Sequence, residues 1–263
     1  MLVKYKKILK IFLITLFWLG VWELISLIIG NRLIFPSIYD VIKRIFQLMF
    51  LENKENHFIL SIISSLGRIG LGIAIGIFSG AVIAFISSFS KTVYDIISPF
   101  ITVIKATPVA SFIILLLVYT YASFIPIIIS ALMVFPIVFS NVYQGIKNVD
   151  ASLLEMCKMY SIPRKVTVKT LYIPSILPYF TSALISSIGL GWKAGIAAEV
   201  LCTPLNSIGK AIFESKIYFE YVDLFAWTAM VIILSIIFEV VVTKSLKKLL
   251  SKITHKYGGD YGN

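Results

Sequence analysis

The sequence predicts an all-α, polytopic membrane protein, a helical bundle with six transmembrane helices. Three observations carry this prediction: only 14% of the 263 residues are charged, 59% are hydrophobic, and the apolar residues form long runs. A soluble domain has roughly 25% charged residues. A run of about 20 apolar residues crosses the ~30 Å hydrocarbon layer as a helix. Helices are expected because lipid offers backbone groups no hydrogen-bond partners.

Six segments are expected to cross the membrane, separated by polar or basic stretches. They are Ile8–Ile29, Leu66–Ser87, Ile96–Val118, Phe124–Val142, Ile176–Leu201 and Val222–Thr243. The first span follows several lysines, as the apolar core of a secretory signal does. It exceeds the roughly 7–15 residues of a cleaved signal, and no A-x-A site follows, so we expect it to remain as an anchor.

The basic residues between the spans orient the chain. With the N-terminus inside, fifteen fall in cytoplasmic segments: Lys4, Lys6, Lys7, Lys10, Lys91, Lys147, Lys158, Arg164, Lys165, Lys169, Lys244, Lys247, Lys248, Lys252 and Lys256. Six fall in external segments: Arg32, Lys43, Arg44, Lys54, Lys210 and Lys216. Because cytoplasmic loops carry the excess of lysine and arginine, both termini of this multi-pass protein are predicted on the cytoplasmic side of the cell membrane.

This topology divides the chain into four regions. They are a cytoplasmic tail with the first anchor (1–30), an external amphipathic segment (31–57), a transmembrane core (58–245) and a basic cytoplasmic tail (246–263). The external segment contains Phe35-Pro36-Ser37, which favours a helix start. Within the core, residues 143–175 form a cytoplasmic loop too long for a simple turn.

Small residues recur at every fourth position on two spans. The second span carries Gly72, Gly76, Gly80 and Ala84, and the fifth carries Gly191, Ala194, Gly195 and Ala198. Such ridges let two helix backbones approach closely in a membrane. They fit packing within one chain or a seam between two copies.

A short amphipathic helix is predicted in the cytoplasmic loop. Leu153, Leu154, Cys157 and Ser161 mark one side, Glu155 and Lys158 mark the other, and Pro163 ends it. Such a helix suits docking against a cytoplasmic partner. Composition equally fits a helix that lies on anionic lipid.

Several classes of function find no support in the sequence. Both histidines, His57 and His255, fall outside the spans, and no two acidic residues share a span at helical spacing, so no catalytic constellation is predicted. Cys157 and Cys202 lack a C-x-x-C spacing, so neither a metal site nor a disulfide framework is expected. The net charge of +11 follows the loops and does not form a nucleic-acid-binding face.

The cytoplasmic loop resembles the signature of the membrane subunits of bacterial ABC importers. That signature reads Glu-Ala-Ala, three residues, Gly, nine residues, then Ile-x-Leu-Pro. Here Glu155 opens the pattern, Ser161 occupies the glycine position, and Leu171-Tyr172-Ile173-Pro174 closes it with the spacing kept. Met156 and Cys157 replace the two alanines.

The resemblance extends from about Leu33 to Lys244 and points to permeases of the nitrate/sulfonate/taurine uptake group. The motifs in order are Leu33-Ile-Phe-Pro-Ser, Ser65-Leu-Gly-Arg68, Lys105-Ala-Thr-Pro108, Val149-Asp150, Ile173-Pro-Ser-Ile-Leu-Pro178, and Trp192 followed by Glu199. It implies the type I ABC importer permease fold and transport by alternating access.

In that family the short loop helix couples the permease to a separate ATPase. The resemblance therefore assigns ATPase coupling to Leu154, Glu155, Met156, Cys157, Ser161 and Pro174. The chain has no G-x-x-x-x-G-K-[ST] phosphate loop, so ATP and Mg²⁺ are expected on partner ATPase subunits and no cofactor on this chain. A second permease copy, as a homodimer, and an extracytoplasmic solute-binding protein are the other partners that the resemblance implies.

Polar residues at membrane depth are candidates for the translocation pathway. They and their neighbours are Lys105, Pro108, Ser111, Trp192, Lys193 and Glu199. A buried charge costs ~2.5–3.5 kcal/mol on insertion scales, so each charge faces either water or a partner on another helix. Lys193 and Glu199, six residues apart, point to different helix faces. Arg68, near a span end, is expected to reach toward the membrane surface.

The solute is less well defined than the class of protein. The resemblance implies a small organic or inorganic anion such as a sulfonate, taurine or nitrate, and the two lysines favour an anion. A pyrimidine precursor of thiamine is an alternative. An ion-gradient-driven transporter or channel is another, although the sequence shows no internal repeat of the kind such proteins often have.

Overall fold

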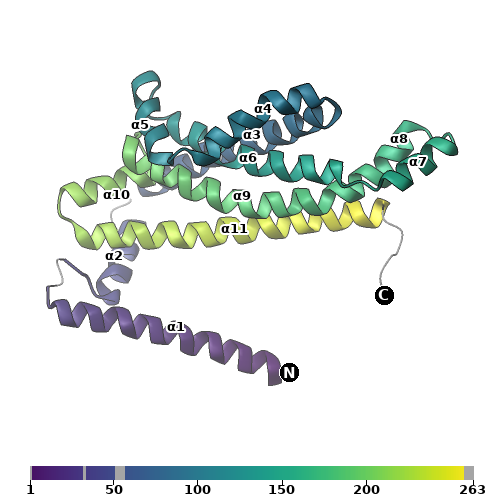
Figure 1. Ribbon diagram of the computed structural model, residues 1–263. Helices are drawn as coiled ribbons and strands as arrows, with labels where there is room; N and C mark the ends of the chain where they lie inside the picture. Colours follow the sequence, from purple (N-terminus) through teal and green to yellow (C-terminus); the bar gives the residue numbers. More distant parts are fainter. Residues whose placement is uncertain (1, 32–33, 51–56, 258–263) are drawn as a thin grey trace.

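The computed structural model describes the backbone of residues 2–31, 34–50 and 57–257, with side chains described for 9–10, 12–31, 34–50 and 57–244. Within these ranges every regular element is a helix (Figure 1). In order they are α1 (Leu2–Ile29), α2 (Ile38–Phe50), α3 (His57–Phe89), α4 (Lys91–Ala106), α5 (Val109–Tyr119), α6 (Ile125–Lys147), α7 (Ala151–Met159), α8 (Arg164–Thr167), η2 (Val168–Tyr172), α9 (Ile173–Cys202), α10 (Ile208–Ile217) and α11 (Tyr221–Tyr257). The predicted all-α membrane bundle is confirmed.

Five of the described helical segments are long and apolar enough to cross a membrane. They are Phe12–Ile29, His57–Phe89, Ile125–Lys147, Arg164–Cys202 and Tyr221–Lys244. The third predicted span, Ile96–Val118, is not one continuous helix: α4 ends at Ala106, α5 begins at Val109, and the two bend by 104°. Counting this bent pair as one span gives six.

Pro108 explains the bend. It has no N–H to donate, and it disfavours a helical conformation at Thr107, which is extended with ψ 130°. Pro108 itself is extended and directly precedes α5. The apolar run that the sequence shows is therefore divided between two helices that point in different directions.

The centre of the bundle consists of α3, α6 and α9. A Cβ on Gly76 or Gly80 would lie 2.7 or 2.9 Å from the carbonyl oxygen of Ala131 or Phe135 on α6. On α9, Gly191 and Gly195 face side chains of α3 and α6 in the same way. Both ridges of small residues thus pack within one chain.

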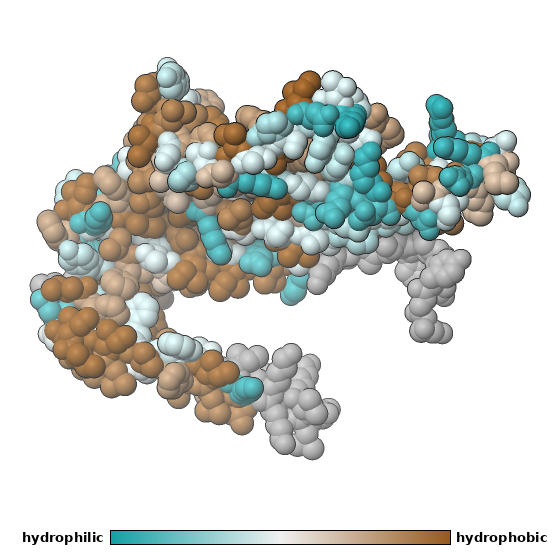
Figure 2. Space-filling view, in the orientation of Figure 1, coloured by the Kyte–Doolittle hydropathy of each residue, from teal (hydrophilic) through white to brown (hydrophobic). Residues whose placement is uncertain are grey.

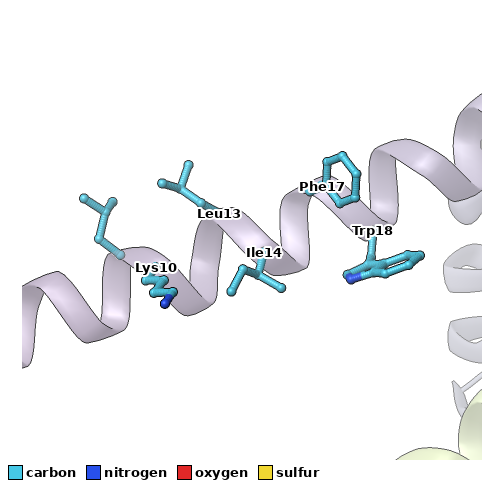
Figure 3. Close-up of a pocket in the computed structure, with 6 residues that line it drawn as sticks. Lys10, Leu13, Ile14, Phe17 and Trp18 are labelled. Carbon is cyan, nitrogen blue, oxygen red and sulfur yellow. The ribbon is translucent and has the colours of Figure 1, made fainter.

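The first helix stands apart from this centre. Figure 1 shows most of α1 away from the bundle; near its end Trp22 packs on Phe225 of α11, with ring centroids 5.5 Å apart, and the chain continues into α2. The side chains of Lys10, Ile14 and Trp18 extend from one side of α1 and those of Leu13 and Phe17 from the other, and a shallow hollow there is lined by α1 alone (Figure 3). Only 6% of its apolar segment Phe12–Ile29 is buried, so most of the surface of α1 is available to lipid.

The α2 helix connects α1 to the rest of the chain. Ser37 begins it, with its hydroxyl accepting a hydrogen bond from the N–H of Asp40 at 3.2 Å, as expected for a helix cap. Trp22 on α1 donates to the carbonyl of Pro36 at 3.1 Å. Arg44 on α2 forms a two-pronged ion pair with Asp223 on α11, with Nη2 2.8 Å from Oδ2.

Figure 1 places the start of α1, the α7–α8 segment and the end of α11 at one end of the bundle. The opposite end carries α2, α10 and the connection from α5 to α6. The α10 helix has no counterpart among the predicted elements; Ser207 precedes it and caps it by accepting a hydrogen bond from the N–H of Lys210. Some residues used to predict the orientation and the cytoplasmic tails lie outside the described part of the structure. They are Arg32 and Lys54, together with the side chains of Lys4, Lys6, Lys7 and residues 245–263.

Candidate functional site

The short helix predicted in the cytoplasmic loop is α7. Asp150 caps its start by accepting hydrogen bonds from the N–H of Ser152 at 2.8 Å and from its hydroxyl at 2.7 Å. These bonds stabilise the charged carboxylate and hold the pKa of Asp150 below its ordinary value. Leu154 is half-buried and Cys157 is buried, whereas Glu155 and Met156 are exposed.

The end of α7 accounts for the motif position at Ser161. Its φ of 50° lies in the left-handed region, which favours glycine. The N–H of Ile162 bonds the carbonyl of Cys157 at 2.9 Å, and the N–H of Ser161 bonds that of Lys158 at 3.1 Å. This pair of bonds is the Schellman ending of a helix. The family's glycine therefore corresponds to a conformation that this chain forms with serine.

Pro174 follows the one described stretch of π-helix. The η2 segment is wider than an α-helix, and its closing bond runs from the N–H of Ile173 to the carbonyl of Val168. In a regular helix the ring of Pro174 would clash with the carbonyl of Thr170, four residues earlier, and would leave it without a donor. The π-helix accommodates this before α9 continues into the bundle.

Lys105 and Lys193 are both exposed. We group them with the exposed polar residues of α6 and α9 under the name polar face, which comprises Lys105, Gln144, Ser182, Ser186 and Lys193. The helices that carry these residues, α4, α6 and α9, pack side by side in that order. Figure 2 shows hydrophilic residues over the middle of this region, while the described part of α1 is mostly hydrophobic. On α9 the exposed positions recur every three or four residues, so they share one side of the helix.

The two lysines of the polar face lie at different depths. Lys105 Nζ donates to Ser140 Oγ at 3.0 Å, whereas Gly191, two residues before Lys193, accepts from Ser130 Oγ at 3.1 Å. Ser130 and Ser140 are ten residues apart on α6 and therefore roughly 15 Å apart along its axis.

Pro108 and Ser111 lie where the membrane segment bends. Both are exposed, close to Lys105 in the chain. The N–H of Ser111 bonds the carbonyl of Pro108 at 3.1 Å and opens α5. The first turn of α5 and its positive dipole end thus follow directly after a cationic side chain.

Trp192 and Glu199 are buried between helices in this structure. Trp192 is 1% exposed and Glu199 0% exposed, so neither lies on the polar face. Trp192 packs against Phe238 of α11 with ring centroids 5.4 Å apart. Its indole N–H is one of two buried side-chain donors without a partner among the described residues. Contact with a solute would require the helices to separate.

Glu199 is the centre of a polar network near the end of the bundle that carries α10. Its carboxylate forms an ion pair with Arg68 at 3.1 Å, and it accepts from the Ser65 hydroxyl at 2.6 Å and the N–H of Gly209 at 3.3 Å. Arg68 also donates to the carbonyls of Leu205 and Asn206 at 2.8 and 2.9 Å. Arg68 therefore joins the buried carboxylate of Glu199 to the connection between α9 and α10.

The network joins α3, α9 and the start of α10. Sequence reasoning missed Ser65 and Gly209 as members. The signal available was the spacing of Ser65 and Arg68, which places both on one side of a helix. No set of three or more His, Cys, Asp or Glu side chains in the described ranges is placed to hold a metal ion.

Comparison with known families decides the class of this protein. The family model described as "Binding-protein-dependent transport system inner membrane component" matches residues 72–254, which include the three central helices for most of their length, α7 and the polar face. The chain belongs to this family of ABC importer permeases. The permease is therefore a transport subunit of a membrane protein complex and not an enzyme.

Curated relatives support the same group within the family. The permease is 23% identical over 247 residues to a putative aliphatic sulfonates transport permease protein of Bacillus subtilis, covering 92% of this chain and 85% of that one. It is 26% identical to a nitrate import permease protein of Synechococcus elongatus, covering 70% and 68% of the two chains. It is 24% identical to a formylaminopyrimidine transport permease protein of Halalkalibacterium halodurans, covering 65% and 68%. The resemblance to the nitrate/sulfonate group is confirmed.

A solved structure supports the fold. The permease aligns with a chain in the crystal structure of an amino acid ABC transporter with histidines, with a TM-score of 0.57 and 20% identity. The alignment covers 80% of the permease and 98% of that chain. At this identity the likeness shows a shared fold, which is the importer permease fold that the sequence resemblance implies.

Proposed function

We propose that this permease forms the path of a small anion across the membrane and that α7 couples the path to a separate ATPase. The observation that carries the proposal is the pair of exposed cations, Lys105 and Lys193, on membrane-spanning helices. A charge at this depth costs ~2.5–3.5 kcal/mol unless water or a partner compensates it. A water-filled path along the polar face would hydrate both lysines and bring them into contact with the solute.

The bend at Pro108 supports an anion over a cation. The N-terminal turn of α5 has N–H groups without partners inside the helix and the positive end of a helix dipole. Half-helices that begin within a membrane bind anionic groups in this way. Together with Lys105 and Ser111 this turn forms the first of two anion-binding sites along the path. Lys193 forms the second.

The α7 helix is suited to contact a cytoplasmic subunit. Met156, Met159 and Tyr160 are large apolar residues with 44%, 84% and 76% of their surface exposed, beside the exposed Glu155. We propose that Leu154 and Cys157 hold α7 to the bundle while Glu155 and Met156 meet the ATPase. ATP and Mg²⁺ would bind on that subunit.

The assembly follows the logic of the family. Two copies of the permease would face each other across the polar face, with both termini in the cytoplasm and a solute-binding protein docking at the end that carries α2 and α10. Closure of the ATPases would move the α7 helices together and open the path outward. Hydrolysis would then restore the inward-facing state.

The identity of the solute has two candidates. Relatives named for sulfonate and nitrate transport favour an anion, as do the two lysines. The relative named for formylaminopyrimidine transport favours a heterocyclic precursor as the second candidate. Solute-stimulated ATP hydrolysis by the reconstituted complex distinguishes the two candidates. Loss of a lysine should reduce the stimulation by an anionic solute and leave the stimulation by a neutral heterocycle unchanged.

Co-purification with candidate ATPase subunits tests the coupling role. The variant Glu155→Lys should release the ATPase while the permease stays folded, because it reverses the charge of the exposed α7 surface. Glu220→Lys, an equal change at an exposed site on the opposite end of the bundle, is the matched control. If the ATPase binds both variants equally, α7 does not couple.

The path is tested in the same complex. Lys105→Gln and Lys193→Gln should each weaken anion-stimulated ATP hydrolysis, with basal hydrolysis retained. Equal stimulation in both variants and the unmodified complex would remove the lysines from the pathway.

A further inference from the structure

A cavity lies behind α7, between this helix and the bundle. Its volume is about 990 Å³, at the upper end of the ~300–1,000 Å³ typical of small-molecule sites. Its wall combines the last turns of α3 and α6 with α7, α8, η2 and the first turns of α9. The apolar part of this wall includes Phe85, Val142, Ile146, Cys157, Ile176 and Phe180.

The loop geometry keeps this cavity open. The wide η2 segment contributes Val168 and Tyr172 to the wall, directly before Pro174. At the other side the Schellman ending at Ser161 turns the chain so that Ile162 enters the wall from α7. Both features depend on the backbone, and π-helical turns are frequent at functional sites.

The charge of the cavity is one-sided. Two cations, Lys158 and Arg164, line it, and no acidic residue does. Both side chains are exposed, and neither forms an ion pair with a described residue. An apolar interior with two cations at its polar side is complementary to an amphiphile that has an anionic head and a hydrocarbon tail.

We propose that this cavity binds one anionic glycerophospholipid, with an acyl chain between α3, α6 and α9 and the phosphate at Lys158 and Arg164. The location favours a lipid over a soluble anion. Phe85 and Phe89 line the cavity from the last turns of a membrane-spanning helix and remain 55% and 68% exposed, so the cavity opens toward the acyl region of the bilayer. Anionic lipids of the cytoplasmic leaflet are attracted to basic segments at this level.

The bound lipid would support α7 from behind. Leu154 and Cys157 attach α7 to the cavity wall, so an acyl chain there fixes the angle at which α7 meets its partner. The lipid would thus regulate coupling without contacting the solute. This proposal rests on the proposed orientation, with α7 at the cytoplasmic side, but lipid binding can be measured without any ATPase.

Alkylation of Cys157 provides a direct test on the full-length chain in detergent. Cys157 is 7% exposed and lines the cavity, whereas Cys202 is 6% exposed and lies outside it. Added dioleoylphosphatidylglycerol, at ten times its dissociation constant, should slow Cys157 alkylation about tenfold and leave Cys202 unchanged, as read by peptide mass spectrometry. Dioleoylphosphatidylcholine and free glycerol 3-phosphate should have little effect.

The outcomes separate the sources of protection. Equal protection by phosphatidylcholine would show that the site selects no charge and would overturn the proposal. Protection by glycerol 3-phosphate alone would identify a soluble anion and would also overturn it. Equal slowing at Cys202 would indicate general stabilisation, with the same consequence.

Variants test the two cations. Lys158→Gln combined with Arg164→Gln should abolish the protection by phosphatidylglycerol. Lys91→Gln combined with Lys165→Gln removes the same charge from the same end of the bundle without touching the cavity and should retain it. If both double variants behave alike, the cations do not form a site. A loss of ATPase binding in these variants, by contrast, would concern the coupling role of α7 and not the lipid.

Discussion

Gly209 lies against Glu199 so closely that a Cβ on Gly209 would collide with the Cβ and the backbone of Glu199. The contact brings the start of α10 onto α9 and lets the N–H of Gly209 reach the buried carboxylate. Only glycine, which has no Cβ, fits at this position.

Replacing Gly209 by alanine should therefore destabilise the permease by about 1–3 kcal/mol, the usual cost of overpacking. Thermal unfolding in detergent measures the change. Gly67→Ala is the matched control, because nothing lies within 4 Å of a Cβ at that helical position. The control should be neutral or stabilising by up to about 1 kcal/mol. An equal loss in both variants would contradict the close contact.

Removing Arg68 should be more costly than removing an exposed cation. Arg68→Met leaves the fully buried Glu199 without its counter-ion, for which about 3–5 kcal/mol is typical. Lys210→Met breaks the exposed pair with Glu214 and should cost less than about 1 kcal/mol. The double variant Arg68→Met with Glu199→Gln should recover part of the stability in a double-mutant cycle. Additive losses would show that the two residues do not interact.

Replacing Ser161 by glycine should stabilise the end of α7. The left-handed φ of 50° costs a residue with a side chain about 1 kcal/mol relative to glycine. Hydrogen exchange of the α7 amides should slow in Ser161→Gly. Ser182→Gly, within the regular helix α9, should instead speed the hydrogen exchange of the neighbouring α9 amides, because glycine weakens a helix interior. Faster exchange of α7 in Ser161→Gly would contradict the assigned turn.

Acid should weaken the start of α7. The pKa of Asp150 is lower in the folded chain than in the unfolded one, so its contribution is fully present above the unfolded value of about 3.9. The contribution is lost as the pH falls through the lower folded pKa. Hydrogen exchange of α7 amides should lose this pH dependence in Asp150→Ala. A variant with the unchanged acid response would show that Asp150 does not cap α7.

Replacing Trp192 by phenylalanine should cost about 1–2 kcal/mol, because the smaller ring leaves a void at a fully buried site. The indole N–H has no acceptor in this structure, so its removal breaks no hydrogen bond, while the aromatic packing on Phe238 is largely kept. Trp192→Ala should instead cost about 3–5 kcal/mol through the cavity it leaves. Thermal unfolding of both variants is the measurement. A loss in Trp192→Phe as large as that in Trp192→Ala would reveal a partner for the N–H.

Local features of the chain were predictable where they depend on nearby residues. The helical spans follow from apolar runs and the start of α2 from Ser37. Lys193 and Glu199 lie on different sides of α9, as their six-residue spacing predicts. Each of these follows from helix periodicity or capping alone. The sequence predicts the end of α7 at Pro163, but the helix ends earlier, at Met159, because the chain turns at Ser161.

Long-range features could not be predicted in the same way. Arg68 and Glu199 are 131 residues apart, and no local pattern says that α3 and α9 meet at that level. Pro108 indicates a disturbed helix, but whether it kinks or ends the helix depends on what the two halves pack against. The contacts at the start of α10 also required tertiary information, because Ile208 bonds Ser65 of α3 and Gly209 bonds Glu199 of α9.

The glycine contacts of α3 have a mechanical consequence. Because Gly76 and Gly80 rest directly on carbonyl oxygens of α6, the two helices have no compressible side-chain layer between them and cannot slide without a clash. A force on α7, which follows directly after α6, would therefore move α3, α6 and α9 together as one rigid body. We then expect changes of shape to occur mainly at the bend between α4 and α5 around Pro108, next to Lys105.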